Sequence, residues 1–164
     1  MTNMLKEARL PASTVLLSLF LAGGAAYAAV GPFGGMAGSW AGGGTLTMSD
    51  GSAERLRCRA SYDVGGTGSD LKLQLKCASA SYNFDLGSNV AYQDGRITGT
   101  WNEASHNVHG AITGHANGGR IEAAVNGQSF AGNLSLTTHG NQQTISIRTQ
   151  GTDITSVTLA LNRH

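Results

Sequence analysis

"GSWAGGGTLTMSDG", residues 38–51, places one tryptophan ahead of a run of glycines and closes on an Asp-Gly pair. A side-chain period of two is typical of a β-strand with one face against a core. Because glycine relieves crowding where a strand coils tightly, the stretch predicts a strand of a small barrel. From residue 40 to 48 one parity holds only apolar residues and glycine: Trp40, Gly42, Gly44, Leu46 and Met48.

A phosphate-binding loop is the alternative interpretation of these glycines. A P-loop requires G-x-x-x-x-G-K-[ST], and a dinucleotide site requires G-x-G-x-x-G between a strand and a helix. Here Thr47 stands where the third glycine should follow Gly42 and Gly44, and no segment of helical period comes next. The sequence therefore favours barrel geometry over a phosphate site.

The alternation continues to the C-terminus in short segments separated by turns, and Asp94-Gly95 is a hairpin signal among them. The two prolines, Pro11 and Pro32, interrupt no expected strand. The chain therefore predicts an all-β fold, an antiparallel up-and-down meander of about ten strands. We expect this meander to close into a barrel, because an open sheet would expose hydrophobic edges.

The first 30 residues have the organisation of a secretory signal peptide. Two basic residues precede an apolar run over 15–21, and Ala26-Tyr27-Ala28 fits an A-x-A cleavage site. A membrane anchor is the alternative, but a span requires ~20 consecutive apolar residues and glycines soon dilute this run. We expect a signal peptide over 1–28, cut between Ala28 and Ala29. The protein would then be exported to the periplasm or the extracellular space of a Gram-negative bacterium.

After the cleavage site we expect a flexible Gly-rich leader over 29–37 and a single barrel domain over 38–164. Cleavage removes two basic residues and one acidic residue from totals of 11 and 10, so the mature chain has nine of each. Nucleic-acid binding depends on phosphate neutralisation by Lys and Arg, so this balance argues against a nucleic-acid partner. Because the outward parity of the strands is charged and polar, the mature form is not expected to be embedded in a membrane.

The two cysteines provide a test of strand register. An even number of cysteines in an exported protein usually pairs. If strands 55–64 and 71–80 form a hairpin, Cys58 lies opposite Cys77 and both face inward. We therefore predict a disulfide between them, structural rather than redox-active because no C-x-x-C pair is present.

Few residues are placed for chemistry. His109 and His115 lie six residues apart on one expected strand, or ~20 Å, which is too far to share a metal ion with each other, and His106 lies in the preceding turn. Asp85 and Glu103 fall on outward parity, so no pair of carboxylates faces the interior as a glycosidase would need. We therefore expect no metal, no cofactor and no catalytic residue, and hence a protein that is not an enzyme.

Inward parity gathers aromatic side chains in an interior that is otherwise apolar or glycine, with Ser88 as the exception. A barrel of this size is either filled by its own side chains or leaves space for a small ligand. Both interpretations stay open, because parity does not measure volume. The candidate ligand-binding residues are Trp40, Tyr82, Phe84, Tyr92, Trp101 and Phe130.

The opening Gly38-Ser39-Trp40 of the first strand, followed by the meander, resembles the G-x-W opening of lipocalins and other calycin barrels. The resemblance implies that the tryptophan packs across the barrel floor and that a 3₁₀ turn precedes it. It also implies that an arginine of the last part of the chain, Arg148 or Arg163, covers the ring. The function that it implies is binding of a small hydrophobic ligand.

The same "AGSW" opening and the early disulfide are also similar to small periplasmic barrels that inhibit secreted metalloproteases. That resemblance implies a protein partner, contacted through the leader over 29–37. The whole sequence, including "ERLRCRASY" and "LKCASASYNFDL", most resembles a family of small exported alphaproteobacterial proteins. That resemblance does not point to any particular activity. We therefore expect a ligand-binding barrel, with a protein-interaction barrel as the alternative.

Overall fold

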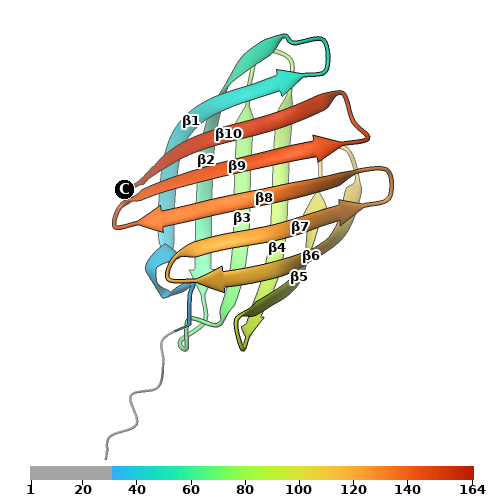
Figure 1. Ribbon diagram of the computed structural model, residues 1–164. Helices are drawn as coiled ribbons and strands as arrows, with labels where there is room; N and C mark the ends of the chain where they lie inside the picture. Colours follow the sequence, from blue (N-terminus) through green and yellow to red (C-terminus); the bar gives the residue numbers. More distant parts are fainter. Residues whose placement is uncertain (1–30) are drawn as a thin grey trace, which may run out of the picture.

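The computed structural model describes residues 31–164, which form a closed barrel of ten strands (Figure 1). The predicted all-β meander is confirmed. The expected signal peptide over 1–28 and its cleavage site lie outside the described residues. No helix in the described part of the chain is long and apolar enough to cross a membrane. The strands are β1 (Gly38–Met48), β2 (Ala53–Val64), β3 (Asp70–Ala78), β4 (Asn83–Gln93), β5 (Arg96–Glu103), β6 (Val108–Asn117), β7 (Arg120–Gly127), β8 (Ala131–His139), β9 (Gln142–Gln150) and β10 (Ile154–Arg163).

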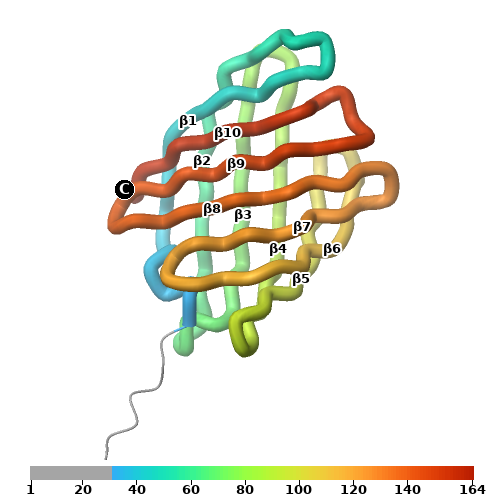
Figure 2. Tube along the Cα trace, in the orientation of Figure 1, coloured from blue at the N-terminus to red at the C-terminus, as the bar shows by residue number. Residues whose placement is uncertain are grey.

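Each strand pairs with its successor, and β1 also pairs with β10, so the sheet has no free edge. The barrel is flattened into two layers, in which β7 to β10 cross in front of β2 to β4 at a steep angle (Figures 1 and 2). The core lies between these layers, where the inward apolar side chains of the strands meet. Closure satisfies the backbone groups that an open sheet would expose at its edges.

Gly42 and Gly44 of β1 lie where the barrel closes. A Cβ atom at Gly42 would lie 2.0 Å from the carbonyl oxygen of Ala160, and one at Gly44 would lie 1.8 Å from that of Thr158. Both oxygens belong to β10, the pairing partner of β1. Only glycine allows so close a backbone approach, and strand β2 rather than a helix follows. The barrel interpretation of the glycine run is confirmed.

We call the end of the barrel at which β1 begins the closed end, and the opposite end the open end. A 3₁₀ turn, η1 (Gly34–Met36), packs at the closed end directly before β1. Phe33 donates its N–H to the carbonyl oxygen of Gly68 (3.1 Å), and the side chains of Phe33 and Met36 are fully buried. The prediction of a flexible leader is therefore wrong for residues 31–37, because this segment is hydrogen-bonded to the barrel and completes its core.

Trp40 forms the floor of the closed end and is completely buried. Its Nε1–H donates to the carbonyl oxygen of Met36 at 2.8 Å. The guanidinium of Arg163 lies 4.5 Å from the centre of the indole ring and donates to two backbone carbonyl groups within 35–37. The 3₁₀ turn and the covering arginine that the calycin resemblance implies are thus present, and the arginine is Arg163 rather than Arg148.

A polar contact is enclosed beside this floor. The Tyr62 ring meets Trp40 edge to face, with ring centres 6.3 Å apart. The Tyr62 hydroxyl donates to Oε1 of Gln143 (2.6 Å), whose Nε2 donates to Thr138 (3.0 Å). Burial raises the pKa of Tyr62, so the hydroxyl stays protonated as a donor. The expectation that Ser88 is the exceptional polar residue of the interior is therefore wrong, because Gln143 is buried as well.

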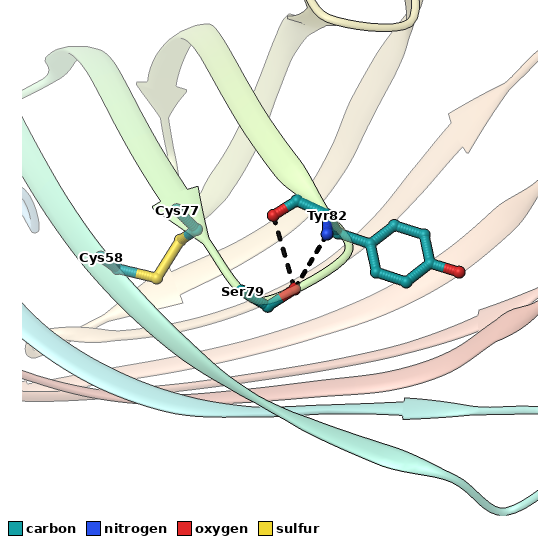
Figure 3. The surroundings of a disulfide bond; sticks show 4 residues. All are labelled: Cys58, Cys77, Ser79 and Tyr82. Atoms are coloured by element: carbon teal, nitrogen blue, oxygen red, sulfur yellow. Dashed lines mark hydrogen bonds between the residues drawn. A yellow bond between two sulfur atoms is a disulfide. The ribbon is translucent and has the colours of Figure 1, made fainter.

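The predicted disulfide is confirmed. Cys58 of β2 and Cys77 of β3 are directly paired across the hairpin and are bonded (Figure 3). Both residues are buried and face inward. Figure 3 also shows the β3–β4 turn, where Ser79 and Tyr82 hydrogen-bond and the Tyr82 ring points away from the disulfide.

Replacing both Cys58 and Cys77 by alanine is expected to lower the free energy of unfolding by about 3 kcal/mol, because the cross-link restricts the unfolded chain. Urea denaturation of the oxidised protein and of the variant measures the difference. Reduction of the unmodified protein with dithiothreitol should give a loss of the same size. An unchanged unfolding midpoint after both treatments would contradict a structural role.

Candidate functional site

The inward surface of strands β7 to β10 is buried unequally between the two ends of the barrel. Toward the closed end, inward side chains such as Leu136, Ile145 and Leu159 are buried. Toward the open end several inward apolar side chains remain partly exposed and pack against the core, whereas Leu46 of β1, Leu56 of β2 and Trp101 of β5 are buried there. Because the sheet is closed, solvent reaches the partly exposed side chains from inside the barrel. We call six of these the open-end lining: Leu75, Phe84, Val125, Leu134, Ile147 and Val157.

Four of the six predicted aromatic residues lie toward the open end, in two pairs. The rings of Tyr82 and Phe84 are stacked, with centres 6.2 Å apart and planes 7° apart. The rings of Trp101 and Phe130 meet edge to face at 5.1 Å. Trp101 is further held by a hydrogen bond from Nε1 to the carbonyl oxygen of Asn126 (3.1 Å). Of these four, only Trp101 is buried.

The other two predicted aromatic residues belong to the closed end. Trp40 forms the floor, and Tyr92 packs edge to face against Phe33 with ring centres 6.4 Å apart. The structure therefore does not bring the six residues together at one site. Sequence parity assigns a side to each residue but not an end of the barrel, which depends on how the N-terminal turn packs.

A concavity of about 830 Å³ lies along β1 to β4, and its lining includes Trp40 and Phe84. Outward side chains of the same strands, among them Arg57, Arg59 and Lys76, also line it. This concavity therefore belongs largely to the outer face of the sheet.

Glu103, the last residue of β5, faces inward and is only 6% exposed. The expectation that it lies on the outward face is wrong, because it shares the parity of buried Trp101. Its Oε1 accepts hydrogen bonds from the backbone N–H groups of Asp85 (2.7 Å) and Ser105 (3.1 Å). Its Oε2 accepts from the backbone N–H and from Nδ1 of His106, both at 2.7 Å.

These bonds determine the charge of Glu103 and the tautomer of His106. Burial alone would raise the pKa of Glu103, but the donors from Asp85, His106 and Ser105 outweigh it and hold the pKa at about 2. Since the carboxylate has no proton to give, Nδ1 of His106 carries the hydrogen of the shared bond. The His106 ring lies 6.4 Å from the ring of Phe84, at the edge of the open-end lining.

Sequence analysis missed this Glu–His pair, although a signal was available. Glu103 follows inward Trp101 by two residues, and His106 follows in a tight turn that brings its backbone N–H back to the carboxylate. His109 and His115 are exposed on the outer face of β6, as predicted. Among residues 31–164, no group of three His, Cys, Asp or Glu side chains is arranged to hold a metal ion.

Replacing Glu103 by Gln is expected to lower the free energy of unfolding near neutral pH by about 2–3 kcal/mol, because the four donors lose a charged acceptor. The folded-state pKa lies below the ordinary value, so the contribution is present above about pH 4.5 and is lost as the pH falls toward 2. Urea denaturation between pH 2 and 7 measures it. Exposed Glu122→Gln is the matched control and should change stability little; equal profiles for both variants would contradict the assignment.

Comparison with known proteins shows a likeness of fold. No protein-family model matches the sequence, and no curated protein matches it. The structure is similar to that of Rv2717c from M. tuberculosis, with a TM-score of 0.65 and 14% identity over 80% of this chain and 94% of that one. It is also similar to the S-type phycobiliprotein lyase CPES from Guillardia theta, with a TM-score of 0.61 and 8% identity over 80% of this chain and 90% of that one.

At these sequence identities the likeness shows the barrel fold alone and gives no information about activity. The resemblance to an alphaproteobacterial family stays a prediction. Because the second protein is a phycobiliprotein lyase, the fold gives no support to the expectation that this chain is not an enzyme.

Proposed function

We propose that this protein binds a small hydrophobic ligand in the open half of the barrel. The observation that carries the proposal is the partial solvent exposure of the open-end lining, whose side chains point inward in a closed sheet. Water in contact with such a surface is displaced favourably by an apolar molecule, by about 25 cal/mol per Å² of apolar surface covered. A bound apolar ligand would bury the side chains of the open-end lining, which the barrel leaves partly exposed.

The two ends of the barrel support this assignment in different ways. The closed end is packed with Phe33, Met36 and Trp40, all without solvent exposure, so it offers a floor rather than an entrance. The open end carries half-buried rings of Tyr82, Phe84 and Phe130. Aromatic rings provide large apolar contact surfaces at little cost in side-chain entropy. A ligand would therefore enter past these rings and rest against the lining.

The proposed binding requires neither a cofactor nor catalysis by the Glu103–His106 pair. A general base must have a pKa near the working pH, and Glu103 has a pKa of about 2. Both of its oxygens are already occupied by donors from the β4 strand and the β5–β6 turn. The geometry therefore supports a structural role for this carboxylate.

The alternative of a protein-interaction barrel depended on a free leader. Residues 31–37 are instead engaged in closing the barrel, through buried Phe33 and Met36 and through the bonds from Arg163. The structure therefore offers less to this alternative than to ligand binding, and we do not propose it.

Export is part of the same proposal, because a buried disulfide is typical of proteins that fold in an oxidising compartment. We expect a signal peptidase to cut between Ala28 and Ala29 and to release a periplasmic or extracellular protein. Expression of the full chain in a Gram-negative host and intact-mass measurement of the periplasmic and secreted fractions test this. Recovery of only the uncut chain, in the cytoplasm or membrane, would contradict export.

Ligand binding is tested with the neutral fluorescent probe N-phenylnaphthylamine, which should become brighter on binding the unmodified protein. Ile147→Trp places a bulky ring in the open-end lining and is expected to weaken probe binding at least tenfold. Thr144→Trp is the control on the same strand, because Thr144 is exposed on the outer face. Melting temperatures establish that both variants fold. Absence of probe binding, or equal binding by the two variants, would overturn the proposal.

A further inference from the structure

At the open end of the barrel, the loops carry acidic side chains but no lysine or arginine. Five loops meet there, over 49–52, 79–82, 104–107, 128–130 and 151–153. Within residues 31–164, these loops and the two strand residues on each side of them contain no lysine or arginine. They contain four carboxylates, which are Asp50, Glu54, Glu103 and Asp153.

At the closed end, the corresponding loops and flanking strand residues carry equal numbers of acidic and basic side chains. They contain the acids Asp63, Asp70 and Asp94 and the bases Arg96, Arg120 and Arg163. The excess of acidic side chains is therefore specific to the open end, which is the proposed entrance for the ligand, and is not a general property of the strand ends.

Hydrogen bonds keep three of these carboxylates, Asp50, Glu54 and Glu103, charged at neutral pH. Hydrogen bonds from Ser52 lower the pKa of Asp50, and hydrogen bonds from Ser79 and Ser81 lower the pKa of Glu54. The next cations along the strands, such as Arg55 and Arg148, are exposed on the outer face of the sheet. An entrance lined by one sign of charge attracts the opposite charge toward the apolar surface behind it.

His106 adds a directional group to this entrance. Its Nδ1–H is engaged by Glu103, and no other residue of 31–164 forms a hydrogen bond with its imidazole ring. In the neutral ring the remaining nitrogen, Nε2, is a hydrogen-bond acceptor. The side chain is 55% exposed and lies beside Phe84 of the open-end lining. A ligand in contact with Phe84 therefore meets an acceptor at its outer end.

We propose that the ligand is a cationic amphiphile, in which a primary ammonium group on an apolar body donates an N–H to Nε2 of His106. This inference rests on the proposed ligand binding and names the chemical class of the ligand. A carboxylate head would face like charges at the entrance and would offer His106 no donor. A trimethylammonium head would have the favourable charge but no N–H, so the two contributions can be separated.

Three amphiphiles of equal chain length test the inference: dodecylammonium, dodecyltrimethylammonium and dodecanoate. Each displaces N-phenylnaphthylamine from the full mature protein at low ionic strength and below its micelle concentration. We expect dodecylammonium to act at a concentration at least tenfold lower than dodecanoate, with dodecyltrimethylammonium between them. His106→Ala should weaken dodecylammonium about fivefold to tenfold and leave dodecyltrimethylammonium within twofold. His109→Ala, an exposed histidine nearby on β6, should change neither.

The outcomes separate the two proposals. If the probe binds and Ile147→Trp removes it, but dodecanoate binds as tightly as dodecylammonium or His106→Ala has no selective effect, the cationic ligand is overturned and ligand binding stands. If neither the probe nor any amphiphile binds, both proposals fail. Melting temperatures of the two histidine variants show whether a loss of affinity comes from a loss of folding.

Discussion

The contact between Trp40 and Arg163 is the interaction on which the rest of this barrel depends. It joins the first strand to the last one, at the place where a meander must meet itself to close. The arginine also reaches the backbone before β1, and the indole N–H holds Met36. Cation–π and charged hydrogen bonds are stronger where water is excluded, and Trp40 is fully buried. One cluster therefore fixes the barrel seam, the N-terminal turn and the floor together.

Because the floor closes one end of the barrel, the proposal of a ligand concerns the other end. Within residues 31–164 no equivalent turn packs across the open end. Two other features hold it: the Cys58–Cys77 bond across β2 and β3, and the Glu103 carboxylate that ties the β5–β6 turn to β4. These contacts fasten strands to their neighbours. The side chains of the open-end lining stay in partial contact with solvent, which is the physical basis for proposing a ligand there.

Much of the fold is predictable from the sequence because strands impose a strict period of two. The glycines of β1, the hairpin at Asp94-Gly95 and the pairing of Cys58 with Cys77 follow from parity and turn chemistry alone. In the turn, both Asp94 and Gly95 adopt the positive φ that a tight hairpin requires. Such features are local, or depend on a single hairpin register.

The candidate site is less predictable, because it depends on contacts between distant parts of the chain. Trp40 and Tyr92 share inward parity with Phe84, yet the packing of Phe33 and Met36 assigns them to the floor. Because Glu103 is charged, the sequence predicts it at the surface, but three backbone N–H groups and His106 make its burial favourable. Those donors come from a turn and a neighbouring strand whose geometry no periodic pattern describes.

The central claim is that the barrel is closed at one end and accessible from within at the other. Methyl NMR of the mature protein, titrated with an unlabelled dodecyl chain, tests it most directly. The account predicts shift changes and intermolecular contacts at Leu75, Leu134, Ile147 and Val157, with none at buried Ile145, Leu159 and Leu161. Shift changes confined to outward methyl groups, or centred on the closed end, would contradict it.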